Sequence, residues 1–321
     1  MAAELRGVCA NPQKNAEFRH EKHSATKFTS ERLRELTFGK RELTLSTVRP
    51  YQPFSEDLTE VDIPIWREAL VAAERLLLYS SPVYYGFGVP QGDGSGVIVI
   101  PGFLKTDAYL TLLHSWLGRI GYRSYFSGIG ENADCPHLLI ESRLRAGIAR
   151  AYEETGRKLH LIGHSLGGLI ARSVAARHPD KIASVITLAS PFRGTVAHRI
   201  VLGAAEQVRK RILEEHPEVL PHCFTGRCTC EFLDSLRRPL PESVRETAIY
   251  TRSDGIVDWR YCRTDNPETD FEVPGTHLGL VFNSDAYRVI ACRLKAARSD
   301  RTSCDREKSS RSVPVGRYLE T

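Results

Sequence analysis

One serine motif carries the clearest chemical signal in this sequence. The residues Gly-His-Ser-Leu-Gly-Gly at positions 163–168 follow the apolar stretch Leu159–Ile162 and precede the amphipathic stretch Leu166–Arg177, which predicts a strand-to-helix turn. Glycine is needed on both sides of the serine because larger side chains would collide with the neighbouring backbone. A chance motif in a loop is the alternative, and the strand–turn–helix context disfavours it. We therefore predict that Ser165 is a nucleophile.

Two backbone amides are candidates for stabilising negative charge beside this serine. Leu166 begins the predicted helix, where free N–H groups and the helix dipole favour an anion. Pro101-Gly102-Phe103 follows the apolar stretch Val97–Ile100, and a glycine there lets the chain turn sharply. An ordinary Pro-Gly turn is the alternative. We predict that the amides of Phe103 and Leu166 form an oxyanion hole.

An aspartate and a histidine that could activate the serine follow it in the chain order Ser, Asp, His. Asp254 and Asp258 both come after the predicted strand Thr247–Tyr250, and we favour Asp254 because it lies nearer the strand end. His277 lies after the last predicted strand and before the last predicted helix, where the base is expected. The sequence thus predicts a triad of Ser165, His277 and Asp254, with Asp258 as the alternative acid; the other histidines are interpreted as structural.

The elements that would position these residues alternate between strands and helices. Such alternation predicts an α/β fold, with a mostly parallel central sheet and helices on both faces. The expected strands are Val97–Ile100, Gly121–Phe126, Leu159–Gly163, Ile182–Leu188, Thr247–Tyr250 and Asp270–Val273. The expected helices are Thr106–Ile120, Leu138–Thr155, Leu166–Arg177 and Ser284–Ala297.

The interval Pro191–Val244 interrupts this alternation, since it contains no convincing strand. It leaves the sheet directly after an apolar strand and must cross the carboxyl edge, where such folds bind ligands. Its apolar residues, mostly at three- and four-residue spacing, predict a helix with one apolar face: Ile200, Val201, Leu202, Ala205, Val208, Ile212 and Leu213. We predict a helical lid insertion, 191–244, over the pocket; permanent packing on the core is the alternative.

Domain boundaries follow from where the periodic patterns begin and end. Residues 1–60 show no sustained period and are predicted to be a flexible or loosely packed extension. Residues 61–297 form the predicted folded domain, and the Arg- and Ser-rich residues 298–321 a disordered tail. A helix packed on the core is predicted near the start of the domain from the spacing of its apolar residues, with Trp66 and Leu70 widening the face formed by Ile65, Ala69, Ala72, Leu76 and Leu77.

The composition of the chain is that of an ordinary globular protein, with 41% hydrophobic and 26% charged residues among 321. The net charge of +5 lies mostly at the ends: residues 1–50 hold ten Lys or Arg against six Asp or Glu, and residues 293–321 hold eight against four. Basic ends on an acidic body argue against a nucleic-acid partner. We interpret them as solvated tails, with peripheral contact to an anionic membrane as the alternative.

Residues 1–30 lack the apolar segment of a secretion signal, and no stretch is long enough for a membrane span, which predicts a cytoplasmic location. The eight cysteines are then expected to be free thiols. Cys223, Cys228 and Cys230 lack the paired spacing of common zinc sites. We therefore predict neither a metal nor an organic cofactor, with a metal at these three cysteines as the alternative.

Together these motifs resemble the lipase/esterase branch of the α/β-hydrolase superfamily, and bacterial lipase-like proteins in particular. Asp-Gly-Ile-Val at residues 254–257 and Gly-Thr-His-Leu-Gly-Leu at residues 275–280 match the family's acid and base motifs. The resemblance covers roughly residues 95–297 and implies that 61–297 is an α/β-hydrolase domain. Pro101 departs from the family pattern, which has a histidine before the glycine of the oxyanion loop.

The resemblance implies a carboxylic-ester hydrolase that acts through an acyl-enzyme on a small-molecule or lipid ester. An acyltransferase or thioesterase with the same triad is the first alternative, since these enzymes differ in the nucleophile that deacylates the serine. A non-catalytic binding protein with the same fold is the second. All the triad residue types and both glycines beside the serine are intact, which argues against that second alternative.

Overall fold

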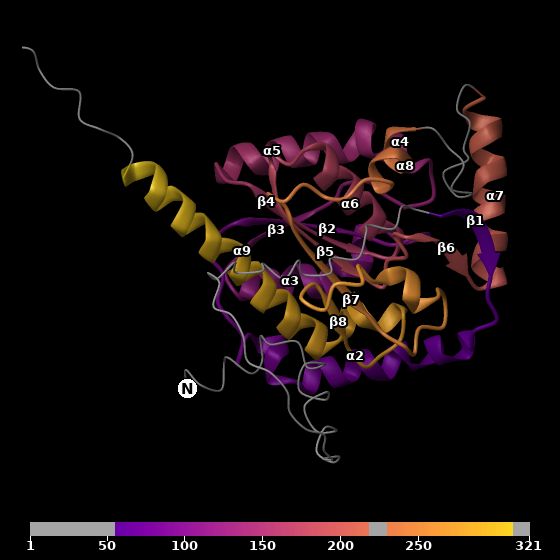
Figure 1. Cartoon of the computed structure of the whole chain (residues 1–321). Coiled ribbons are helices and arrows are strands. Elements are labelled where there is room, and N and C mark those ends of the chain that lie inside the picture. Colours follow the sequence, from indigo (N-terminus) through magenta and orange to yellow (C-terminus); the bar gives the residue numbers. More distant parts are fainter. Residues whose placement is uncertain (1–54, 218–229, 311–321) are drawn as a thin grey trace, which may run out of the picture.

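The computed structural model describes residues 55–217 and 230–310 of the chain (Figure 1). Most of the predicted N-terminal extension, part of the predicted lid with Cys223 and Cys228, and the end of the predicted tail lie outside these described residues. The domain boundaries at residues 60 and 297 therefore stay predictions. The strand β1 (Ser55–Glu60) lies inside the predicted extension and ends at the first boundary, and the helix α9 (Ser284–Ser310) crosses the second.

A six-stranded sheet lies at the centre of the fold, with strand order β3-β2-β4-β5-β7-β8. All neighbouring strands are parallel, which confirms the predicted α/β architecture. The strands are β2 (Gly96–Ile100), β3 (Arg123–Phe126), β4 (Leu159–His164), β5 (Ile182–Leu188), β7 (Arg245–Tyr250) and β8 (Asp270–Glu272). The chain runs outward from β2 to β3 and returns to the other side of β2 as β4, so the winding direction switches between β2 and β4. Open α/β sheets bind ligands at the carboxyl ends of the strands beside such a switch point.

Helices cover both faces of the sheet, and each face has its own apolar core (Figure 1). Side chains alternate along the strands, so Ile98 and Ile100 of β2 enter one core and Val97 and Val99 the other. The first core is covered by α4 (Pro136–Leu139), η6 (Ile140–Leu144), α5 (Arg145–Thr155), α6 (Leu166–Arg177) and α8 (Glu231–Leu236). The second is covered by α2 (Val71–Ser80), η4 (Pro82–Tyr85), η5 (Asp107–Leu110), α3 (Thr111–Arg119), η9 (Leu278–Phe282) and α9.

The predicted lid interval contains a short strand, so the expectation that it lacks one is wrong. This strand, β6 (Gly194–Ala197), pairs in parallel with β1, and Ala197 forms an antiparallel bridge with Val257 beyond β7. Its sequence, Gly-Thr-Val-Ala, is neither a continuous apolar run nor a strict alternation of apolar and polar residues. The partners of β6 are distant in sequence, and therefore local patterns could not reveal the strand.

The helix expected in the insertion is α7 (Arg199–Glu215), and its apolar residues have different environments. Val208 and Ile212 are buried in the same core as α6, whereas Ile200 is 59% exposed. The C-terminal half of α7 therefore packs on the domain. In its first turn, Val201 and Leu202 pack against a small buried cluster that includes Tyr250, and Ile200 is open to solvent. A lid function for the interval stays a prediction.

The amphipathic stretch near residue 65 forms two elements, the 3₁₀ helix η3 (Ile65–Leu70) and α2, and its predicted orientation is wrong. Four residues expected on the buried face are each more than half exposed: Trp66, Leu70, Leu76 and Leu77. Leu78 is buried instead, as is Glu68. Carboxylates take inward positions here because their partners lie in loops near residues 255 and 277, which helical periodicity cannot reveal.

Cys135, Cys230 and Cys262 form no disulfide, as expected, but Cys292 of α9 is disulfide-bonded, so the expectation of free thiols is wrong there. Disulfides are uncommon in a reducing compartment, and the cytoplasmic location stays a prediction. Among the residues the structure describes, no helix combines the length and apolar character that a bilayer crossing needs.

Candidate active site

The serine motif forms a tight turn between β4 and α6. Ser165 has φ 51° and ψ −123°, a backbone conformation that non-glycine residues rarely adopt. A Cβ atom at Gly163 would overlap the backbone of Gly167, and one at Gly167 would overlap the backbone of Ile100. The turn can therefore form only with glycine on both sides. It lies at the carboxyl end of β4, directly beside the switch point of the sheet.

The predicted base and acid are in direct contact. His277 directly precedes η9, and its Nδ1 lies 2.8 Å from Oδ2 of Asp254, which follows β7. Both side chains are almost fully buried. The other carboxylate oxygen of Asp254 accepts hydrogen bonds from the amides of Ile256 and Val257, each at 2.8 Å. Because the carboxylate accepts from Nδ1–H, Nε2 of His277 is left as the basic nitrogen.

The alternative acid, Asp258, has a different role. It is the N-cap of η8 (Trp259–Cys262), and its carboxylate accepts a hydrogen bond of 2.9 Å from the amide of Arg260. The same carboxylate forms an ion pair with the Arg260 guanidinium. The structure therefore brings Asp254, and not Asp258, to His277.

The electrostatic environment of His277 suits a base. Burial lowers the pKa of its imidazole, but the charge of Asp254, the hydrogen bond to Asp254 and the charge of Glu68 outweigh burial and raise the pKa above its usual value. An imidazole with a raised pKa accepts a proton more readily from a neighbouring hydroxyl.

His164, the residue before Ser165, links the serine turn to the base. Its Nε2 lies 2.9 Å from the main-chain oxygen of His277 and therefore donates to it, and the two rings are 5.0 Å apart. Burial, together with the charge of His277, lowers the pKa of His164 to about 3, so its imidazole is neutral. The interpretation of His164 as a packing residue is compatible with this contact, which also holds the elbow and the base loop together.

The predicted oxyanion loop, residues 101–103, lies beside the serine turn. A Cβ atom at Gly102 would lie 2.8 Å from Nδ1 of His164 and 3.1 Å from Cβ of Ser165, so a larger residue there would have to displace the buried His164 ring. Leu166 is the first residue of α6, where the helix N-terminus favours negative charge. The structure thus brings the loop of Phe103 and the helix start at Leu166 to the same serine.

Asn132, which the sequence does not single out, holds the oxyanion loop in place. Its side-chain amide donates to the carbonyl of Pro101 at 2.8 Å, its main-chain oxygen accepts from the amide of Leu104 at 2.9 Å, and it is fully buried. These bonds span the loop on both sides of Gly102. Asn132 therefore stabilises the loop in which proline replaces the family's histidine.

Three more residues near the base are absent from the sequence-based prediction. Glu68 and Glu74 accept hydrogen bonds from amides of the base loop, and the hydroxyl of Tyr109 donates to the carbonyl of Leu278 at 2.6 Å. A pair of acidic residues among the apolar positions of η3 and α2 is the one local signal that could have drawn attention to the two glutamates. Their partners, about 200 residues away, give no local pattern.

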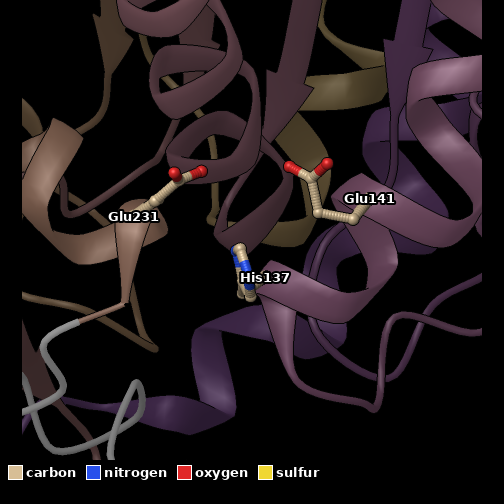
Figure 2. A group of neighbouring side chains, drawn as sticks. All are labelled: His137, Glu141 and Glu231. Carbon is tan, nitrogen blue, oxygen red and sulfur yellow. The ribbon is translucent and has the colours of Figure 1, made fainter.

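A second cluster of ionisable residues lies away from the triad. His137, Glu141 and Glu231 have potential ligand atoms within 4.8 Å of one another (Figure 2). Nη2 of Arg177 lies 2.6 Å from Glu141 and 2.5 Å from Glu231. This guanidinium already supplies the positive charge that the two carboxylates need, so we assign the cluster no metal. It joins α8 of the insertion to α6 and η6.

A family-level comparison covers the segment that contains the serine turn. Residues 155–212 match the family model of the alpha/beta hydrolase fold. The matched segment spans β4, the turn at Ser165, α6 and β5. The chain has the α/β-hydrolase fold. The strand order of the sheet and the geometry of the serine turn agree with this fold.

Two curated proteins that are similar to part of this chain are triacylglycerol lipases. A triacylglycerol lipase of Burkholderia plantarii is 31% identical over 135 residues, which are 39% of this chain and 37% of that lipase. A triacylglycerol lipase of Pseudarthrobacter phenanthrenivorans is 34% identical over 108 residues, which are 31% of this chain and 34% of that lipase. The matched segments thus span well under half of these curated relatives. Among solved structures, a metagenome-derived lipolytic enzyme has a TM-score of 0.46 at 17% identity, with 66% of this chain and 96% of that one covered.

Proposed function

We propose that this α/β-hydrolase is a serine hydrolase that cleaves carboxylic esters of small molecules or lipids. Ser165 is the nucleophile, His277 the base and Asp254 the third member of the triad. The buried contact of 2.8 Å between Asp254 and His277, beside the strained turn of Ser165, carries this proposal. Similarity to two triacylglycerol lipases supports the substrate class.

The proposed reaction proceeds through an acyl-enzyme. Nε2 of His277 accepts the proton of the Ser165 hydroxyl as Oγ attacks the ester carbonyl, and Asp254 stabilises the imidazolium and its orientation. The amides of Phe103 and Leu166 donate to the developing oxyanion, and each such donor stabilises the transition state by about 2.7–4 kcal/mol. The imidazolium then protonates the leaving alcohol. Water repeats the attack on the acyl-serine, with His277 again as the base, and releases the acid.

The substrate class is tested with purified full-length protein and two matched series of acyl donors. Para-nitrophenyl esters and acyl thioesters, from acetyl to palmitoyl, are assayed with and without an added alcohol as acyl acceptor. We expect ester hydrolysis with a clear optimum of chain length, because a pocket of fixed size favours one range. Turnover of thioesters alone would favour a thioesterase, and acyl transfer to the added alcohol in preference to water would favour an acyltransferase. Absence of turnover in every arm would contradict the proposal.

The insertion at residues 191–244 is proposed to act as a lid that sets acyl specificity. Ile200 begins α7 with 59% of its surface exposed, so a charged residue there should alter contacts with a long acyl chain at little cost in stability. We expect Ile200→Glu to lower activity on long-chain esters several-fold relative to short-chain esters, with a nearly unchanged melting temperature.

The matched control on the same helix is Ile212→Ala. Ile212 is completely buried, so its truncation should destabilise the fold by about 2–5 kcal/mol and leave the chain-length profile unchanged. A chain-length profile of Ile200→Glu identical to that of the wild type would show that this turn of α7 does not contact substrate, and would favour permanent packing of the insertion.

A further inference from the structure

We propose that Glu68 is a positioning residue of the triad, whose carboxylate joins the loop of Asp254 to the loop of His277. This inference rests on the proposed function, because it assigns a further role at the same site. Glu68 comes from η3, which precedes the sheet in the chain and contributes nothing else to the triad contacts described above.

The carboxylate of Glu68 accepts three main-chain hydrogen bonds from the two loops. Oε1 accepts from the amide of Gly255, next to Asp254, at 2.9 Å and from the amide of His277 at 3.1 Å. Oε2 accepts from the amide of Leu278 at 2.8 Å. Glu68 is only 8% exposed, and hydrogen bonds to a buried carboxylate are stronger than those between neutral groups. The acid and base loops are thus held by one side chain that touches both.

The loops are shaped around this carboxylate. A Cβ atom at Gly255 would lie 2.8 Å from Oε1 of Glu68 and 3.0 Å from the carbonyl of Pro64. An alanine at position 255 would therefore displace either the carboxylate or the backbone that precedes η3. Glycine directly after Asp254 is explained by the close approach of Glu68.

The strand β6 links the chain that leads into η3 to the acid loop. The strand before it, β1, pairs with β6, and the amide of Val61 donates to the carbonyl of Ala197 at 3.1 Å. The carbonyl of Val196 in β6 also accepts a hydrogen bond of 3.0 Å from the amide of Asp258, in the acid loop. The strand β6 therefore binds both the chain that leads into η3 and the loop that carries the acid.

Glu74 of α2 makes a similar contact but reaches only the base loop. It accepts from the amide of Thr276 at 2.7 Å and from the hydroxyl of Thr276 at 2.6 Å. A Cβ atom at Gly279 would overlap its carboxylate. Because it does not contact the acid loop and its charge is not among those that raise the pKa of His277, Glu74 is a matched control for Glu68.

Glu68 acts on the base through its charge as well as through its hydrogen bonds. The ionisable groups around His277 are Asp254 at Nδ1, Glu68 at the main-chain amide, His164 at the carbonyl, and Tyr109, which binds the next carbonyl. Burial lowers the pKa of His277, and the negative charges of Asp254 and Glu68 raise it. Removal of the Glu68 charge should therefore lower the pKa of His277.

The test compares Glu68→Gln with Glu74→Gln in the full-length protein. Since the base must be neutral to accept a proton, a lower pKa of His277 moves the acid limb of kcat/KM to lower pH. We expect Glu68→Gln to show this movement together with a loss in kcat of about 10- to 100-fold, since small misplacements of catalytic groups have effects of this size. Glu74→Gln should keep the acid limb of the wild type. An unchanged kcat and acid limb in Glu68→Gln, or equal movement of the limb in both variants, would overturn the inference.

Two further measurements separate this inference from the proposed function. Titration of the His277 imidazole by nitrogen-15 NMR reports its pKa without any turnover. The effect of Glu68 on this pKa can therefore be measured even if the wild type hydrolyses no ester. Glu68→Asp keeps the charge but shortens the side chain, so it should retain the wild-type pKa of His277 more closely than Glu68→Gln while kcat still falls. If Glu68→Gln does not fold, Glu68→Asp and Glu74→Gln decide the question. Wild-type kcat in folded Glu68→Asp would contradict a positioning role.

Discussion

Replacement of Ser165 by alanine should lower kcat for ester hydrolysis by about 10⁶-fold, the effect of removing a catalytic serine in a comparable triad. The hydroxyl is the only group of this residue that could attack a carbonyl, and the variant keeps Cβ and the turn. A fluorophosphonate probe should label the wild type at Ser165 and leave Ser165→Ala unlabelled, as read by mass spectrometry of the labelled peptide.

A second serine provides the control for this measurement. Ser190 lies just beyond the end of β5, and its buried hydroxyl donates to the carbonyl of Leu188 at 3.1 Å. Ser190→Ala should retain labelling at Ser165. Undiminished labelling of Ser165→Ala, in a variant whose melting temperature matches the wild type, would rule out Ser165 as the nucleophile.

Replacement of Asp254 by asparagine should lower kcat by about 10⁴-fold, as amidation of the triad aspartate does in a serine protease. The carboxamide is neutral, and its NH2 group, turned toward His277, favours the tautomer with the proton on Nε2. The imidazole then cannot accept the proton of Ser165. The measurement is kcat across pH for the ester with the highest turnover, together with the melting temperature.

Asp258→Asn is the matched control, because it makes the same chemical change four residues away. Asp258 caps η8 and pairs with Arg260, and asparagine is also a good N-cap. We expect kcat within a few-fold of the wild type and at most a small loss of stability. A larger loss of kcat in Asp258→Asn than in Asp254→Asn would reverse the assignment of the acid.

Local patterns predicted the central sheet well. The strands are short apolar runs between helices with one apolar face, so their alternation indicates βαβ units wherever they pack. The serine turn is also a local feature, since Gly163 is needed for a contact within the turn, with the backbone of Gly167. These elements depend on neighbours close in the chain, and a sequence displays such neighbours directly.

Local sequence patterns did not predict elements whose hydrogen-bond partners lie far away in the chain. The helical stretch at residues 65–78 was assigned a buried apolar face, but Glu68 and Glu74 point inward because amides near residues 255 and 276 bind them. The sequence does not reveal the strand β6, because Gly-Thr-Val-Ala shows no apolar run or strict alternation and its partners are β1 and residue 257. In both cases the hydrogen bonds that determine the structure join segments too distant in sequence for a local pattern to include both.

The α/β architecture and the chain order of the candidate residues Ser165, Asp254 and His277 were evident from the sequence, because turn geometry, apolar periodicity and chain order are local or serial properties. The tertiary structure adds the 2.8 Å contact that joins Asp254, rather than Asp258, to His277, and this contact is what supports Asp254 as the proposed acid. The tertiary structure also revealed Glu68, 209 residues before His277. Long-range hydrogen bonds of this kind depend on how loops meet at the sheet edge, which composition and spacing do not encode.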